Sequence, residues 1–352
     1  MSWEDNIRKV VPYVPGEQPR DGETVIKLNT NECPYPPAPG VRECMEKMTY
    51  EDFRLYPDPE ASDLTGVISE YYHVPQDQIF VGVGSDDVLS MSFLTFFNGE
   101  KPILFPDITY SFYDVWASLY RIPYKAVPLD KDFRIDKKDY YFPCGGVIIP
   151  NPNAPTGILE PVSFFEDIVK MHPDEVVIVD EAYIDFGGKS CLSLIDKYDN
   201  LLVVQTFSKS RAMAGMRIGY AFGSRKLIKY LKDAKFSFNS YTMNRPSLIM
   251  GTASVKDDAY FKDTCAKIIK TRERTEKKLT ELGFTFPESS ANFVFVSHAK
   301  VPAKEIFTKL KEKHFFVRYF DKPRIDDYLR ITIGTDEQMD KLIEALEEIV
   351  GE

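Results

Sequence analysis

The chain has 352 residues, 43% of them hydrophobic and 28% charged, which is ordinary for a soluble globular protein. The formal net charge of −10 argues against a general binder of nucleic acids or anionic membranes. The five cysteines show no CxxC spacing, the N-terminus lacks an apolar leader, and no apolar run is long enough to span a membrane. We therefore expect a cytoplasmic protein without a disulfide framework, a metal site or a membrane span.

The opening of the chain is rich in proline, with Pro12, Pro15, Pro34 and Pro36 among its first residues, so we expect an extended arm. From about residue 79 to 222, short apolar runs alternate with helix-like stretches. The strand-like runs lie at 79–84, 102–105, 146–150, 175–180 and 201–207. They show little polar alternation, so both faces of each strand are predicted to be buried. This pattern indicates an α/β fold with a mostly parallel sheet between helices.

The pattern of apolar and charged residues changes after about residue 245. A charged, periodic stretch at 260–282 predicts one long amphipathic helix that ends near Gly283. Further strand-like runs at 292–297, 315–320 and 328–334, with helices near 303–313 and 335–349, indicate a smaller α+β domain. We therefore expect three parts: an N-terminal arm (1–28), a large domain (29–245) and a small domain (246–352).

Polar residues follow four of the five strand-like runs. These segments are "GSDD" (84–87), "NPNAPTG" (151–157), "DEAY" (180–183) and "FSK" (207–209). In a sheet of this kind, ligands bind at the carboxyl ends of the strands. We therefore expect the four segments to meet in one crevice.

The residues of that predicted crevice suit a specific chemistry. A nearby cation such as Arg217 and partial desolvation would favour the uncharged amine of Lys209, which can form a Schiff base with a carbonyl. The carboxylate of Asp180 could pair with a protonated ring nitrogen. Together these features are the signature of pyridoxal phosphate. The phosphate would be bound by Ser85, by the amide groups of 84–86 at a helix start, and by Thr206, Ser208 and Arg217.

The ordered set of motifs resembles the fold-type I aminotransferases and, within them, the histidinol-phosphate aminotransferase family. The matching segments are "LNTNECPYPP" (28–37), "RLYPDP" (54–59), "VGVGSDDVL" (81–89), "PDITYSFY" (106–113), "NPNAPTG" (151–157), "VIVDEAYIDF" (178–186), "TFSKSRAMAGMRIGYAFG" (206–223) and "YLRITIGT" (328–335). The resemblance covers essentially the whole chain. It implies a fold-type I fold, a homodimer, and transamination between histidinol phosphate and 2-oxoglutarate in histidine biosynthesis.

The resemblance also implies roles for individual residues. Lys209 would bind the cofactor and move the α-proton, Asp180 would keep the pyridine nitrogen protonated, and Tyr183 would contact the phenolic oxygen of the ring. Tyr110 would stack on the ring. The residues implied around the phosphate are Gly84, Ser85, Asp86, Thr206, Ser208 and Arg217, with Tyr56 from the neighbouring subunit.

One position departs from the family's commonest form of this motif, NPNNPTG, because residue 154 is alanine. If the asparagine before the PTG segment makes the ring contact, that contact is lost here or is made by Asn153. We take Asn153 as the expected ring contact.

The substrate side rests on residues far from Lys209. Arg330 matches the arginine that meets the substrate's anionic end in this fold type, and Arg318 lies on another strand-like run twelve residues earlier. The substrate that the resemblance implies carries a phosphate, and two guanidinium groups bind a phosphate better than one. Tyr13 matches a family tyrosine near the same phosphate.

Other functions remain open on the same scaffold. They are an aromatic amino-acid aminotransferase, a threonine-phosphate decarboxylase and a non-catalytic regulator that binds the cofactor. For the regulator, about 28 residues precede the first motif, too few for a DNA-binding domain. No nucleic-acid partner is expected.

Overall fold

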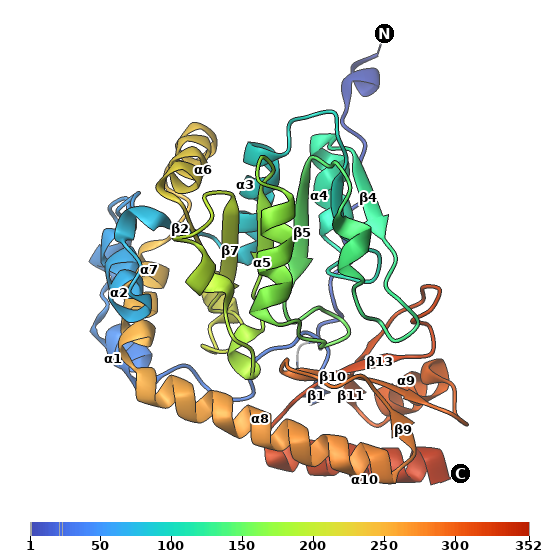
Figure 1. Ribbon diagram of the computed structural model, residues 1–352. Coiled ribbons are helices and arrows are strands. Elements are labelled where there is room, and N and C mark those ends of the chain that lie inside the picture. Colours follow the sequence, from blue (N-terminus) through green and yellow to red (C-terminus); the bar gives the residue numbers. More distant parts are fainter. Residues whose placement is uncertain (1, 21, 23, 352) are drawn as a thin grey trace.

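The computed structural model describes residues 2–20, 22 and 24–351, and its largest sheet has seven strands (Figure 1). In spatial order these are β2 (Ile79–Gly82), β8 (Gly219–Gly223), β7 (Leu201–Thr206), β6 (Val177–Asp180), β5 (Gly146–Pro150), β3 (Ile103–Pro106) and β4 (Tyr124–Val127). β8 runs antiparallel to both of its neighbours, and the other neighbouring pairs are parallel. The predicted mostly parallel sheet is confirmed.

Helices cover both faces of this sheet, as Figure 1 shows. Alternate residues of β6 enter different cores, because side chains of a strand alternate between the two faces of the sheet. Val177 and Val179 pack in one core cluster and Ile178 in the other. The first core includes residues of α2 (Ser62–Tyr72), α5 (Val162–Met171) and α7 (Arg245–Lys256), and the second includes residues of α3 (Ser85–Phe96), α4 (Tyr113–Tyr120) and α6 (Arg225–Phe238). The lack of polar alternation in the sequence therefore reflects burial on both faces.

A second, antiparallel sheet lies in the C-terminal part of the chain. Its order is β12 (Arg318–Tyr319), β13 (Leu329–Thr332), β10 (Phe293–His298) and β9 (Phe284–Thr285). It packs with α9 (Ala303–Glu312) and α10 (Asp336–Gly351) in a core of its own. The predicted long helix is α8 (Asp258–Glu281), which runs beneath both parts of the molecule in Figure 1.

The N-terminal segment joins the smaller part of the molecule. β1 (Ile26–Lys27) pairs in parallel with β11 (Phe315–Phe316). The predicted boundary between the large and small domains falls at the start of α7, which packs against α1 (Pro39–Lys47) and α2. The division into three parts stays a prediction.

The remaining helical segments are short 3-10 turns. They are η1 (Trp3–Asn6), η2 (Tyr50–Phe53), η3 (Gln76–Gln78), η4 (Lys137–Tyr140), η5 (Ile184–Phe186), η6 (Cys191–Leu194) and η7 (Ala214–Met216). Within residues 2–20, 22 and 24–351, no helix is both long and apolar enough to cross a membrane.

The start of β8 lies against the turn that begins α3. A Cβ atom added to Gly219 would lie 2.2 Å from the backbone of Gly84 and Ser85. We therefore expect Gly219→Ala to lower the free energy of unfolding by about 1–3 kcal/mol, as overpacking of a tight site does. Gly215→Ala is the matched control, because a Cβ there meets no atom within 4 Å. Its effect should stay within about 0.5 kcal/mol in urea unfolding, and equal effects of the two changes would contradict this packing argument.

Candidate active site

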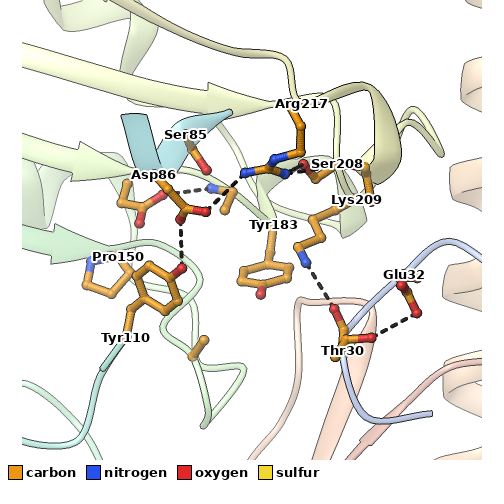
Figure 2. A pocket seen from close by; sticks show the side chains of 14 residues that line it. Thr30, Glu32, Ser85, Asp86, Tyr110, Pro150, Tyr183, Ser208, Lys209 and Arg217 are labelled. Atoms are coloured by element: carbon orange, nitrogen blue, oxygen red, sulfur yellow. Dashed lines mark hydrogen bonds and ion pairs between the residues drawn. The ribbon is translucent and has the colours of Figure 1, made fainter. Parts of the chain in front are cut away.

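A cavity of about 240 Å³ opens at the carboxyl ends of β2, β5, β6 and β7 (Figure 2). Its lining includes Ser85 and Asp86 after β2, Pro150 and Ala154 at the end of β5, Asp180 and Tyr183 at the end of β6, and Ser208 and Lys209 after β7. The four polar strand ends singled out in the sequence therefore lie together. Tyr110 and Arg217, also predicted site residues, line the same cavity.

One end of the cavity is cationic and rich in donors. The Arg217 guanidinium contacts the Ser208 hydroxyl at 3.4 Å and the Asp86 carboxylate at 3.1 Å. Gly84 directly precedes α3 with φ +85°, and a Cβ there would lie 2.4 Å from the guanidinium. Glycine at this position therefore lets Arg217 approach the start of the helix, where free backbone N–H groups favour an anion. Thr206 lies behind Ser208, because the two hydroxyls hydrogen-bond at 3.0 Å and Thr206 does not line the cavity.

Tyr110 closes the side of the cavity next to this anion-binding end. Its hydroxyl donates to Asp86 at 2.7 Å, and Figure 2 shows the ring within the cavity. Burial and the neighbouring Asp86 carboxylate raise the pKa of Tyr110 well above its ordinary value, so the hydroxyl stays protonated and acts as a donor.

Asp180 is the buried carboxylate at the floor of the site. It is 4% exposed, and burial raises its pKa to about 6. Hydrogen bonds from the Tyr113 hydroxyl (2.8 Å) and the Ala182 amide (3.2 Å) act in the opposite direction. Tyr113 was not among the predicted site residues. A buried carboxylate of this kind is suited to pair with a cation that enters the cavity.

The wall opposite the strands is formed by the segment that follows β1. The Lys209 amine donates to the backbone carbonyl of Thr30 at 3.1 Å, and both Thr30 and Glu32 line the cavity. Asn31 donates through its side-chain amide to the Tyr183 hydroxyl at 2.9 Å. The segment "LNTNECPYPP" (28–37) carries part of the family resemblance, but no site residue was predicted within it. That resemblance was the one signal in the sequence that this segment lies near the site.

The structure does not place Asn153 in the cavity, contrary to the expected ring contact. Its amide nitrogen donates to the Ile108 carbonyl and to the Thr156 hydroxyl, and its oxygen accepts from Thr109. The side chain therefore stabilises the turn after β5. Ala154, not Asn153, lines the cavity and packs beside Tyr183.

The two predicted substrate arginines lie opposite one another on β12 and β13. Arg318 and Arg330 are a directly paired position of this antiparallel ladder. Arg330 donates to the Asn29 carbonyl at 2.9 Å, next to the cavity wall, and burial with the nearby Arg318 lowers its pKa. Tyr13 stacks on Phe112 at 4.2 Å and shares a second depression with Arg318. These three residues are thus close to each other but do not line the main cavity.

Tyr56 lies apart from the cavity. Its side chain is 80% exposed and stacks on Tyr241 at 4.6 Å, in a surface depression formed by residues 52–57 and 241–246. Within this chain it therefore makes no contact with the candidate phosphate site.

Comparison with known proteins identifies the family. The sequence model of aminotransferase class I and II matches residues 23–346. The chain belongs to the class I and II aminotransferases. Two relatives, both named histidinol-phosphate aminotransferase, come from Lactococcus lactis subsp. lactis (51% identical, covering 98% of this chain and 96% of the relative) and Brachyspira hyodysenteriae (50% identical, covering 98% of each).

A solved structure agrees with this assignment. The histidinol-phosphate aminotransferase of Sinorhizobium meliloti, in complex with pyridoxal-5'-phosphate, matches with a TM-score of 0.85 and 25% identity. The match covers 94% of this chain and 92% of that one. The aminotransferase family and its fold-type I architecture therefore apply to nearly the whole chain.

The residues of the cavity fit pyridoxal 5'-phosphate. The cofactor has an anionic phosphate, a ring nitrogen that can be protonated, and a carbonyl that reacts with an amine. In the cavity, the start of α3 with Arg217 suits the phosphate, the buried Asp180 suits the protonated ring nitrogen, and the Lys209 amine suits the carbonyl. In residues 2–20, 22 and 24–351, we find no cluster of side chains that could bind a metal ion.

The buried carboxylate makes a testable prediction about the cofactor-free enzyme. Because the pKa of Asp180 is raised to about 6 from 3.8, its contribution to stability is present below pH 4 and is lost as the pH rises through about 6. Asp180→Asn should therefore stabilise the cofactor-free protein at pH 7.5 by up to roughly 3 kcal/mol. The gain should shrink as the pH falls towards 4.5, measured by urea unfolding at each pH. The same change should weaken binding of the cofactor, and a gain that does not vary with pH would contradict the assignment.

Proposed function

We propose that this enzyme transfers the amino group of histidinol phosphate to 2-oxoglutarate, with pyridoxal phosphate as its cofactor. The proposal rests on relatives of that name at about half identity over nearly the full length. The observation in the structure that carries the substrate assignment is the Arg318–Arg330 pair.

The pair is unusual because like charges directly opposite on neighbouring strands repel one another. Among the described residues, neither guanidinium forms an ion pair with a carboxylate, and the Arg330 Nε has no hydrogen-bond partner. A dianionic phosphate would relieve the repulsion and accept from both groups. The same pair would bind a carboxylate of 2-oxoglutarate in the second half of the reaction.

The cofactor, when bound, supplies a ring that takes up the electron pair left by cleavage of the substrate Cα–H bond. In our proposal, Lys209 would hold the cofactor through Nζ. Once the substrate amine has taken its place, the freed Nζ would accept the proton from the substrate Cα and deliver it to the cofactor carbon that carried the carbonyl group. The Thr30 carbonyl, 3.1 Å from Nζ, orients the free amine.

Asp180 and the phosphate end hold the cofactor in one orientation. The Asp180 carboxylate would accept a hydrogen bond from the protonated ring nitrogen and keep the proton there, because Tyr113 and the Ala182 amide fix the carboxylate. Gly84, Ser85, Ser208 and Arg217 would bind the phosphate, while Asp86 holds Tyr110 and Arg217 and Thr206 fixes Ser208. Tyr110 would pack against the ring, and Tyr183 would contact its phenolic oxygen.

We further propose a cytoplasmic homodimer in which Tyr56 reaches the phosphate of the partner subunit. Tyr56 and the nearby Tyr50, Phe53 and Leu55 are exposed large side chains on one segment, and Tyr241 lies beside them. A contiguous apolar patch of this kind is typical of an interaction surface. The five cysteines are free, as suits a reducing compartment.

A half-reaction assay tests the substrate. L-histidinol phosphate should convert the enzyme-bound cofactor to its amine form with a higher kcat/KM than phenylalanine, and L-threonine phosphate should release no carbon dioxide. Arg318→Met should lower kcat/KM for histidinol phosphate by about 10- to 100-fold, because a hydrogen-bonded charge is lost. Arg225→Met is the control, since Arg225 pairs with Asp77 at the surface. If phenylalanine is the better donor and Arg318→Met leaves histidinol phosphate unaffected, the assignment fails.

A complementation experiment tests the role of Tyr56. Lys209→Ala and Tyr56→Ala subunits should each form a poor enzyme alone. In a mixed dimer, the Tyr56→Ala subunit keeps its own Lys209 and receives Tyr56 from its partner, so one site of two is restored. Activity should therefore rise on subunit exchange. If Tyr56 acts within its own subunit, mixing will restore nothing.

A further inference from the structure

Asn31 is held in one orientation by contacts to three parts of the fold. It is 1% exposed, and its φ of +56° lies in the left-handed region, which asparagine tolerates better than most residues. Its backbone N–H donates to the Thr332 hydroxyl at 3.0 Å, and its carbonyl accepts from Asn292 at 2.9 Å. The side-chain amide then reaches the Tyr183 hydroxyl at 2.9 Å.

The contacts also favour one orientation of the amide, because the flipped orientation would leave the Thr332 hydroxyl hydrogen without an acceptor among the described residues. The Thr332 hydroxyl accepts from the Asn31 backbone, so its own hydrogen is free to be donated to Asn31 Oδ1 at 3.1 Å. Because Oδ1 is paired with Thr332, Nδ2 is the atom that faces Tyr183. The amide therefore donates, and the Tyr183 oxygen accepts.

This donation determines where the Tyr183 proton points. A phenol hydroxyl has a single hydrogen, and an incoming donor occupies one of its lone pairs. Among the described residues, Asn31 is the hydrogen-bond partner of this hydroxyl, and we find no acceptor for its hydrogen. Tyr183 lines the cavity beside Lys209, whose Nζ lies 5.9 Å from the centre of its ring. The hydrogen is therefore available to an acceptor inside the cavity.

We propose that Asn31 is a positioning residue for the reaction: its amide orients the Tyr183 hydroxyl so that its proton is donated to the phenolic oxygen of the bound cofactor. The position that could have supplied an amide from the strand side is Ala154, which packs against Tyr183, and the Asn153 amide is engaged elsewhere. This inference rests on the part of the proposed function that assigns pyridoxal phosphate as the cofactor. It does not depend on the assignment of histidinol phosphate as the substrate.

The expected consequence is spectroscopic. A donor on the phenolic oxygen withdraws negative charge that would otherwise stabilise a proton on the nitrogen of Lys209. Removing the Asn31 amide should therefore raise the pH midpoint of the cofactor's visible absorbance change by about 0.5–1 unit. The charged residues that line or border this cavity are Lys209, Asp180, Glu32, Asp86, Arg217 and Arg330, and removal of the amide in Asn31→Gly changes none of them.

The test is a pH titration of the substrate-free holoenzyme. Asn31→Gly keeps the left-handed backbone and removes the amide without adding a charge, so it is the deciding variant. Asn31→Asp keeps the shape but replaces the donor by a carboxylate, whose negative charge should add to the shift. Both should raise the midpoint. Asn153→Ala, the control, removes an equally buried amide that does not contact Tyr183, and it should leave the midpoint in place. In a Tyr183→Phe background, Asn31→Gly should cause no further shift, because the two groups act through one contact.

Each other outcome overturns the proposal. If Asn31→Gly and Asn31→Asp lower the melting temperature but leave the midpoint unchanged, Asn31 has a purely structural role. A shift with Asn153→Ala alone would return the ring contact to Asn153. An undiminished shift in the Tyr183→Phe background would mean that Asn31 acts by another route. A parent protein that shows no visible band would overturn the cofactor assignment too, whereas failure with histidinol phosphate alone would leave this inference standing.

Discussion

The direction of β8 is the constraint on which the cofactor site depends. β2, β5, β6 and β7 all end at one edge of the sheet. β8 lies between β2 and β7 and runs the opposite way, so it begins at the edge where they end. Gly219, its first residue, pairs with Gly82 on one side and Thr206 on the other. Arg217, two residues earlier, is therefore brought to the start of α3 and to Ser208.

That arrangement explains how much could be predicted from the sequence. Apolar runs with polar ends identify strands whose ends carry chemistry, and Lys209 and Asp180 follow directly from that pattern. The residues that were missed are far from their contact partners in the sequence. Asn31 contacts Tyr183 across 152 positions, and Lys209 contacts Thr30 across 179. No local periodicity reports such contacts.

The contacts of Asn153 could not be predicted from the sequence for a different reason. Neighbouring residues of a turn point in different directions, and a sequence pattern does not tell which of them faces a cavity. Here the Asn153 side chain satisfies the turn's own polar groups, and the alanine beside it faces the site. A short polar side chain that can bond to nearby backbone often does so, which competes with any role towards a ligand.

The small sheet shapes the cavity through the N-terminal segment more than through its own side chains. The Leu28 amide donates to Phe316 and its carbonyl accepts from Thr332, so both edges of this segment are held by C-terminal strands. The next residues carry that constraint into the site: Asn29 meets Arg330, and Thr30 meets Lys209. A ligand that draws Arg318 and Arg330 together therefore acts on the same short stretch of backbone that contacts the reactive amine. The substrate arginines and Lys209 are more than a hundred residues apart in the sequence. In the structure they contact neighbouring residues of one segment, because Arg330 binds the carbonyl of Asn29 and Lys209 binds that of Thr30.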